Sequence, residues 1–413
     1  MKKTIKVLCI IIIFALLTLF FSASYSKFII DNIAVVVAMG IDVDSDSSSK
    51  NNLKVSFQFI DASSVSESGS SETAPAVLKT VSASSISSAI NLIDSYVNNE
   101  ITLSHCKLIV FSEEIAKKGI ADDIYTLINN IQVRPTANIV ISKCTAESYL
   151  ENSKPLFEPL ISKYYEQFVN SSLYTGYTTN ATLGDFFDRM VCYACEPSAI
   201  LGGINLNLQD SDNKNTATVN KEALDKSNFS SLKGSTSSEN IGSAVFKDGT
   251  LVGELNAIES LAYMCISNNL KGFQISVPNP NVENAYIDVY LTPSKPSKTK
   301  VSLVNGSPYI NVNCQFSGQI LSMEKNANYL EASSLSKISD SCNRYLEYVF
   351  SQYLYKTSKE FKSDINGFGK NAKKLFATSE KFENYNWRDT YSDSFFNVHV
   401  KVNVKSASLI SNS

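Results

Sequence analysis

The sequence has little histidine and tryptophan and no excess of charge of either sign. Its 413 residues include two histidines, His105 and His399, and one tryptophan. So few histidines leave little material for an imidazole-rich metal site or a histidine proton relay. The 37 basic and 40 acidic residues nearly cancel to a net charge of −3, and beyond the N-terminus no run of Lys or Arg suggests a nucleic-acid groove. We therefore expect no nucleic-acid partner.

Sequence motifs of common enzymes are also missing. No glycine-rich loop with phosphate-binding spacing follows an apolar run, and no G-x-S-x-G nucleophile elbow occurs. Glu113-Glu114 and Asp122-Asp123 are paired carboxylates, but both pairs open helical patterns, where negative charge interacts favourably with the helix dipole. We expect no catalytic residue, no cofactor and no metal, which disfavours an extracytoplasmic hydrolase.

Cysteine is sparse and scattered. In an oxidising compartment a clustered, even set would indicate a disulfide framework, whereas these residues are mostly flanked by apolar neighbours, so buried thiols are favoured. Cys192-Tyr193-Ala194-Cys195 has the spacing of a redox pair or of half a zinc site. No second pair and no nearby histidine completes four ligands, so a local structural role is favoured. The eight cysteines are Cys9, Cys106, Cys144, Cys192, Cys195, Cys265, Cys314 and Cys342.

The two histidines offer no nucleophile and base pair. His105 is adjacent to Cys106, and neighbouring residues on a strand point to opposite faces, so the two side chains cannot face each other. We expect His105 to be a strand histidine with a hydrogen-bonded ring. His399 alternates with apolar valines on a predicted strand and is expected to be solvated.

Asp42, Asp44 and Asp46 resemble the start of a calcium loop, in which alternating carboxylates converge on one cation. Position six of that loop is Ser47 instead of Gly, and position twelve is Leu53 instead of Glu. An acidic turn between two strands is therefore favoured.

The N-terminus predicts export through a membrane. Three lysines precede an apolar run from Val7 to Phe21, and a small, polar Ser22-Ala23-Ser24 follows. This arrangement leaves the basic end inside and places everything after Ser24 outside the cytoplasm. The length fits either a cleaved signal peptide or a retained anchor, and both remain open.

The first half alternates strand and helix patterns. The run from Ile33 to Ile41 is continuous and β-branched, as expected of a strand in the middle of a sheet, and Leu53 to Ile60 reads as its neighbour. The serine-rich Ala62 to Ala74 predicts a surface loop. We expect strands over 33–41, 53–60, 76–81, 101–111 and 138–141, and helices over 86–97, 113–118, 120–131, 145–151, 159–169 and 183–191.

The second half opens with a hairpin. Asp248-Gly249 between two apolar runs predicts a type I′ turn, and Asn256 with Glu259 predicts a capping box on the next helix. A long helix carries one apolar face: Leu335, Ile338, Cys342, Leu346, Val349 and Tyr353. We expect strands over 273–277, 285–291, 301–304 and 309–316, and a strictly alternating strand over 397–404 that closes the sheet.

These patterns predict an α+β fold of two or three domains, each a mixed or antiparallel sheet covered by helices. From Gln209 to Asn240 large apolar residues are too few to offset ordering entropy, which indicates a linker or long loop. The expected organisation is a signal peptide or membrane anchor (1–24), an N-terminal domain (28–200, alternatively two subdomains split near 145), the linker (205–240) and a C-terminal domain (241–408).

Four stretches, in order, resemble one family: the C subunit of the nutrient germinant receptors of endospore-forming bacteria. They are Gly40-Ile41-Asp42, the segment from Leu103 to Ile120 with Arg134 trailing, the segment from Ala244 to Gly253, and Trp387 shortly before the Val398 to Val404 strand. Each motif alone is mostly strand and turn chemistry, and the four in sequence cover nearly the whole chain.

The resemblance implies a non-enzymatic spore germination protein attached to the outer face of the spore's inner membrane, in complex with the integral membrane A and B subunits. Family members usually carry a lipid-modified cysteine before the first strand, whereas Tyr25 to Ile30 contains none, so lipidation is not expected and a retained helix is favoured. Partner contacts are expected at the Glu113–Gly119 helix and the Asp248-Gly249 hairpin. The alternative is an anchored extracytoplasmic protein that binds a small nutrient.

Overall fold

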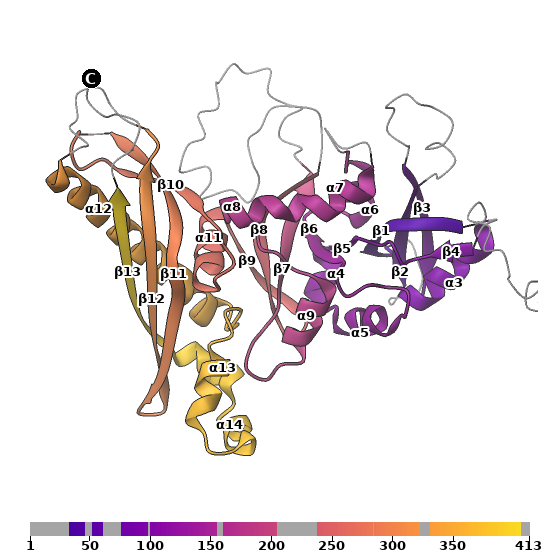
Figure 1. Cartoon of the computed structure of the whole chain (residues 1–413). Helices are drawn as coiled ribbons and strands as arrows, with labels where there is room; N and C mark the ends of the chain where they lie inside the picture. Colours follow the sequence, from indigo (N-terminus) through magenta and orange to yellow (C-terminus); the bar gives the residue numbers. More distant parts are fainter. Residues whose placement is uncertain are drawn as a thin grey trace, which may run out of the picture.

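The fold was analysed in a computed structural model of the chain (Figure 1). It describes residues 33–45, 52–60, 76–97, 100–154, 160–204, 238–283, 285–322 and 331–405. The expected N-terminal segment, the 62–74 loop, Asp46 and residues 205–237 of the expected linker lie outside the described residues. The last three linker positions, 238–240, already belong to a strand.

A nine-stranded mixed sheet forms the N-terminal region (residues 33–204 and 238–255). Its strand order is β3-β2-β1-β5-β6-β7-β8-β9, and β4 pairs alongside β1. The central neighbours β1, β5, β6 and β7 run parallel, and the flanking pairs are antiparallel. The strands are β1 (Ile33–Val43), β2 (Leu53–Ile60), β3 (Ala76–Ala83), β4 (Glu100–Thr102), β5 (Leu108–Ser112), β6 (Asn138–Ser142), β7 (Ser198–Ile204), β8 (Ser238–Lys247) and β9 (Thr250–Leu255).

Helices cover both faces of this sheet. Figure 1 shows α6 and α7 on one side of the central strands and α5 and α9 on the other. Ser85 caps the first helix by accepting a hydrogen bond from the Ser88 N–H at 3.1 Å. The helices are α3 (Ile86–Tyr96), α4 (Glu113–Lys118), α5 (Ala121–Asn129), α6 (Ala146–Glu151), α7 (Ile161–Gln167), η2 (Phe168–Ser171), α8 (Ser172–Thr175) and α9 (Leu183–Met190).

Two details of the first half were predicted wrongly. The expected strand over 101–111 is two strands, because the Cys106 N–H donates to the Leu103 carbonyl oxygen at 2.9 Å and turns the chain. His105 therefore lies exposed in that turn and not on a strand. The helix expected over 120–131 ends earlier, at Asn129, and Ile131 beyond it is fully exposed.

The predicted hairpin completes the first sheet. Asp248 and Gly249 adopt positive φ angles of 50° and 77°, as a type I′ turn requires. Along β8, Ala244 and Phe246 contribute to the core of the N-terminal region, while Val245 packs in the core of the remainder of the chain. Consecutive strand residues face opposite sides, so the two faces of β8 pack into different cores.

The C-terminal region (residues 257–405) is built on a second sheet of order β10-β11-β12-β13. Two strands predicted separately over 285–291 and 301–304 form one long strand, β11. Pro293 and Pro296 are accommodated where the register to β12 shifts, so the strand continues past them. The strands are β10 (Phe273–Pro278), β11 (Tyr286–Val304), β12 (Ser307–Ile320) and β13 (Phe395–Lys405).

A long helix, α12 (Ala332–Tyr355), packs along this sheet, and its predicted apolar face is confirmed. It also supplies side chains to the outer edge of β13. The backbone N–H groups of Val400, Val402 and Val404 donate to Glu347 Oε1, Asn343 Oδ1 and Ser339 Oγ at 3.0, 2.7 and 3.1 Å. These three edge donors of β13 are therefore satisfied by a helix.

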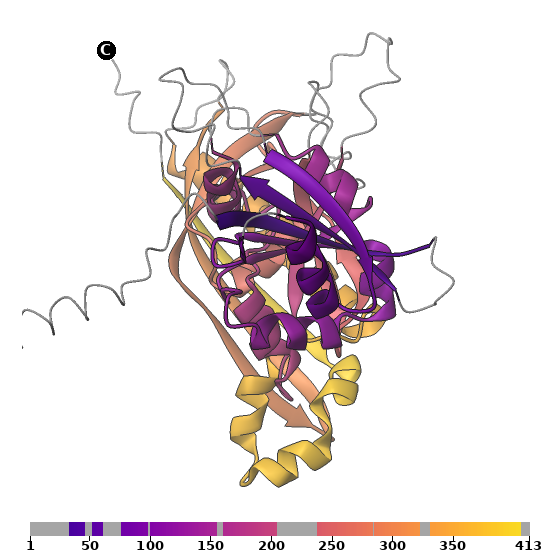
Figure 2. The same cartoon turned by 90° about the vertical axis from the view of Figure 1, so that its right-hand side faces the viewer.

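The remaining helices are α11, which connects the first sheet to the second, and a group that lies between α12 and β13. The predicted capping box is present at α11 (Ala257–Ile266), where Asn256 and Glu259 bond each other's backbone. Figure 2 shows the helices between α12 and β13 gathered at one end of the molecule. They are η4 (Lys356–Glu360), α13 (Gly369–Ala372), η5 (Lys373–Leu375), α14 (Ser379–Tyr385), α15 (Trp387–Thr390) and η6 (Tyr391–Asp393).

Candidate functional site

The two segments singled out for partner contacts lie side by side. The Ile120 N–H, two residues after α4, donates to the Gly249 carbonyl oxygen of the hairpin at 2.9 Å. A Cβ atom on Gly249 would lie 2.9 Å from the Cβ of Ala121, so only glycine fits this approach. The tip of the hairpin is therefore buried against the start of α5, and within the turn Asp248 is exposed.

An ionic chain joins α4 to β9. Lys143 Nζ lies 3.0 Å from Glu113 Oε2 and 2.7 Å from Glu254 Oε1. Burial alone would raise the pKa of Glu113, but hydrogen bonds from Lys117 and Lys143 outweigh it and lower that pKa. The carboxylate of Glu113 is thus used inside the molecule to hold α4 against the hairpin.

The outward side of α4 carries exposed charges of both signs. We call Glu114, Lys117 and Lys118 the α4 strip. Glu114 and Lys118 pair at 2.9 Å across one helical turn, an arrangement worth only a few tenths of a kcal/mol in an exposed position. Lys117 pairs with Glu113 across one turn in the same way and is itself 61% exposed, so stability makes little demand on these three side chains.

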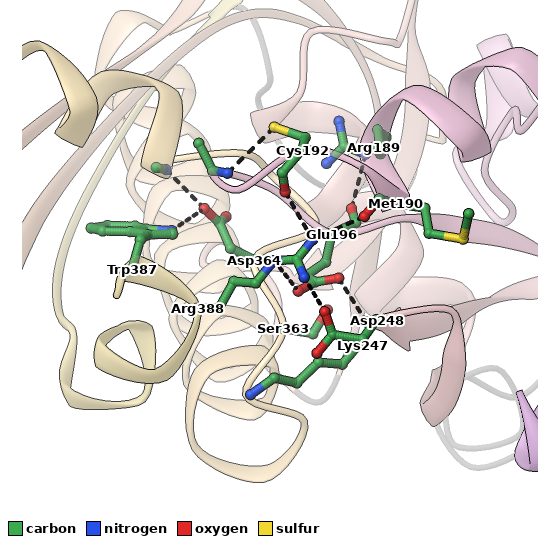
Figure 3. A network of polar contacts seen from close by, with 12 residues as sticks. Arg189, Met190, Cys192, Glu196, Lys247, Asp248, Ser363, Asp364, Trp387 and Arg388 are labelled. Carbon is green, nitrogen blue, oxygen red and sulfur yellow. Dashed lines mark hydrogen bonds and ion pairs between the residues drawn. The ribbon is translucent and has the colours of Figure 1, made fainter. Parts of the chain in front are cut away.

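On its other side the hairpin meets Arg388, which reaches it from α15 (Figure 3). The guanidinium forms an ion pair with Asp248, and its Nε lies 3.0 Å from Glu196 Oε1. Its Nη2 donates to the carbonyl oxygens of Met190 and Cys192, each at 2.9 Å. One side chain of the C-terminal region thus binds three segments of the N-terminal region.

Glu196 is the buried carboxylate of this network. Its side chain is 1% exposed, and its Oε2 accepts the Asp248 N–H at 3.1 Å. Burial raises the pKa of Glu196 to about 7, against the opposing attraction of Arg388. A proton therefore binds this position more readily than it binds an ordinary glutamate.

Asp364 organises the C-terminal side of the contact between the two regions. Its carboxylate accepts the backbone N–H groups of Gly367, Phe368 and Gly369 at 2.8, 3.0 and 2.8 Å, and Trp387 Nε1–H at 2.9 Å. Burial raises its pKa although the hydrogen bonds from Gly369, Phe368 and Trp387 oppose the shift. Arg189 Nε donates to the Glu196 carbonyl oxygen at 2.9 Å. We call the contacts among Arg189, Glu196, Asp248, Asp364 and Arg388 the junction (Figure 3).

A cavity of about 570 Å³ opens beside the junction, between α9 and the end of α11. Its lining carries both signs of charge, and deeper in it the Ser198 hydroxyl donates to Tyr263 Oη at 3.2 Å. Polar lining residues include Asp188, Arg189, Ser198, Tyr263, Lys271 and Lys370.

Two family models match the chain. The model described as spore germination protein N-terminal domain covers residues 26–197, and the model described as spore germination B3/GerAC like, C-terminal, covers residues 241–408. The chain belongs to the germinant receptor C subunit family. No curated protein matches it. The solved structure of the GerBC protein resembles this C subunit in fold, with a TM-score of 0.50 and 13% identity over 89% of this chain and 96% of the other.

Gly40-Ile41-Asp42, the first of the motifs that resemble the family, contributes to packing. Gly40 lets α6 approach β1, since a Cβ there would lie 3.1 Å from the Cβ of Ala146. Asp42 accepts the N–H groups of Ala146 and Glu147 at 2.7 and 3.0 Å and so holds the start of α6. The expected acidic turn between two strands therefore does not include Asp42, which is buried within β1.

The other candidate residues named from the sequence do not lie together in the structure. His399 is exposed on β13, as predicted, and Asp122 and Asp123 lie in the first turn of α5. Within the described ranges no group of three or more His, Cys, Asp or Glu side chains is arranged to hold a metal ion. Among those same residues no helix has the length and apolar character needed to cross a membrane.

Sequence reasoning missed the junction of this C subunit. Arg189, Glu196, Asp364 and Arg388 are isolated charges with no shared spacing. One local signal existed: Asp364 precedes Gly367 by three residues, a pattern typical of a side chain that bonds its own following backbone.

Proposed function

We propose that this chain is the non-enzymatic, membrane-attached C subunit of a spore nutrient germinant receptor, acting on the outer face of the spore's inner membrane. The observation that carries the proposal is the match of both family models, in order, to the two regions of the chain. The basic, apolar N-terminal segment supports attachment to the membrane.

Within that role the α4 strip is the surface that we propose contacts the integral membrane A and B subunits. Glu114, Lys117 and Lys118 are exposed, contribute little to stability and sit on a helix that is held rigidly against β9 by Glu113 and Lys143. Rigid presentation reduces the ordering entropy that association costs, and charged side chains favour orientation of a partner.

The test is co-purification of the A and B subunits with this chain from spore membranes. Lys117→Glu with Lys118→Glu should reduce recovery of both partners several-fold. Lys373→Glu with Lys374→Glu is the matched control, because it changes two adjacent exposed lysines in the C-terminal region. A chain that purifies from spores as a free soluble monomer would contradict the receptor role, whereas equal recovery with both variants would contradict only the α4 strip.

The cavity beside the junction favours a second candidate function, binding of a small nutrient. Its volume of about 570 Å³ falls in the range of ligand sites, and its lining presents cations and carboxylates together. Direct measurement of amino-acid binding to residues 28–413 separates the two, since a scaffold shows no affinity. Lys271→Ala should weaken any binding in the cavity, and Lys374→Ala should not.

A further inference from the structure

The loop between α9 and β7 carries two free cysteines in one tight turn. Cys192 and Cys195 flank Tyr193 and Ala194, which form the centre of the turn. A turn of four residues holds its end Cα atoms within about 7 Å, which overlaps the range of about 4.4–6.8 Å found in disulfides. The Cα spacing of the turn is therefore compatible with a disulfide, and the two thiols are close enough to hydrogen-bond each other.

The two thiols differ in access. Cys195 is 1% exposed, whereas Cys192 is half-buried beside Tyr193, which is 69% exposed. A more accessible thiol next to a buried one is the arrangement in which the first attacks an external partner and the second resolves the product.

Hydrogen bonds and cations favour the thiolate of Cys192. The Ala194 N–H donates to its Sγ at 3.4 Å, and Arg189 and Lys370 are close enough to act on it. The hydrogen bond from the Cys195 thiol has the largest effect on the pKa of Cys192, and the Ala194 N–H and the two cations add to it. Together they lower that pKa well below the usual range although burial opposes the shift. The same interaction with Cys192, together with burial, raises the pKa of Cys195.

The other cysteines of the described chain lack this environment. Cys106 and Cys342 are buried in apolar surroundings, and burial raises the pKa of each to about 12. Cys144 is half-exposed, but burial raises its pKa as well. Cys192 is thus distinguished from them by its chemistry and not by exposure alone.

We propose that Cys192 and Cys195 are a redox-active pair that closes into a disulfide by exchange with an external disulfide. The Cys192 thiolate attacks one sulfur of that disulfide, forms a mixed disulfide and releases one thiolate. Cys195 then loses its proton, attacks Cys192 Sγ and releases the second thiolate. Two protein thiols are oxidised, and one external disulfide is reduced to two thiols.

The position of the pair links its oxidation to the junction. The Cys192 carbonyl oxygen accepts a hydrogen bond from Arg388, and Cys195 packs against Gly367 in the loop that Asp364 organises. The pair does not lie at the start of a helix, and the cations Arg189 and Lys370 take the place of a helix dipole in favouring the Cys192 thiolate.

The test uses the purified full chain equilibrated with oxidised and reduced glutathione, acid-quenched and labelled with N-ethylmaleimide after denaturation. Under excess oxidised glutathione the peptide that contains both cysteines should lose the mass of two hydrogen atoms and take up no label. Cys195→Ser should instead retain one glutathione on Cys192, and Cys144→Ser should leave disulfide formation unchanged.

Alkylation kinetics provide a second readout, which the wild-type protein already gives without the cysteine variants. At about pH 6.5 iodoacetamide should alkylate Cys192 at least about tenfold faster than Cys144, because only the thiolate reacts. Lys370→Gln should shift the pH profile of Cys192 alkylation upward. Persistently free thiols in wild-type protein under excess oxidised glutathione, or alkylation of Cys192 no faster than that of Cys144, would overturn the proposal.

Discussion

The two sheets of this protein bury their side chains in different ways. In β5 and β6 of the N-terminal region every residue is buried, so the usual alternation of a strand disappears. In β12 of the C-terminal region buried residues alternate with exposed or half-exposed ones along the whole strand. The difference follows from cover: helices lie on both faces of the first sheet, whereas α12 covers one face of the second.

The length of an apolar run in the sequence therefore indicates how many faces of the sheet are covered at that strand. A two-sided strand gives an unbroken run such as Leu108 to Phe111, while a one-sided strand gives alternation such as Val398 to Val404. The open face of the second sheet is consequently polar, with Asn313, Gln315 and Gln319 along β12.

The strongest test of the comparison truncates neighbouring residues on one strand. The side chains of Leu108 and Ile109 are buried on opposite faces of β5. Replacing either by alanine should lower the free energy of unfolding by about 2–5 kcal/mol. In β12 Ile310→Ala should cost as much, whereas Asn313→Ala should change it by less than about 0.5 kcal/mol. Urea unfolding followed by circular dichroism measures all four, and a neutral Leu108→Ala or Ile109→Ala would show an uncovered face.

The next test asks how pH acts on the junction between the two regions. Glu196 has a folded-state pKa of about 7 and an unfolded value of about 4.3, so folding retains a proton that the unfolded chain releases between these values. Stability should therefore fall by about 2–3 kcal/mol as pH rises from about 4.5 to 7. Unfolding of Glu196→Gln should lose this pH dependence; an unchanged slope in that variant would place the titration elsewhere.

A smaller effect is expected where β9 meets the segment after α12. A Cβ atom on Gly253 would overlap the ring of Phe361, so Gly253→Ala should destabilise the protein by about 1–3 kcal/mol. Phe361→Ala in the same chain should recover part of that loss, and a double-mutant cycle measures the coupling. Purely additive losses would mean that the two regions do not touch at this point.

The smallest predicted effect concerns the edge of the second sheet. Asn343→Ala removes the acceptor of the Val402 N–H and should cost about 1 kcal/mol, with faster hydrogen exchange at that amide. Arg344→Ala, which changes the exposed neighbour on α12, is the control and should have an effect below about 0.5 kcal/mol. Equal exchange rates in both variants would indicate that the helix does not protect the strand.

Local patterns predicted much of the fold. Asp248-Gly249, the Asn256 and Glu259 capping box, and the apolar face of α12 are each determined by neighbours within a few residues. The predicted family and the α+β class are confirmed as well. The domain limits and the partner surface stay predictions.

The junction could not be predicted, because its contacts join residues far apart in sequence. Asp248 and Arg388 are separated by 140 positions, and neither belongs to a periodic pattern. The pairing depends on the hairpin, α15 and the loop after α9 meeting in space, which is decided by tertiary packing. Similarly, the separate strands predicted over 285–291 and 301–304 are joined into β11 by pairing with β12, which local sequence does not report.

The contact of α12 with β13 depends on a match between the rise of the helix and the rise of the strand. One turn-like step of four helical residues advances about 6.0 Å, and two strand residues advance about 6.6 Å, so Ser339, Asn343 and Glu347 fall opposite every second amide. The helix thereby takes the place of a further strand. A foreign peptide or a second molecule cannot extend the sheet there by backbone pairing, so growth into aggregates is blocked on that side without a proline or a bulge.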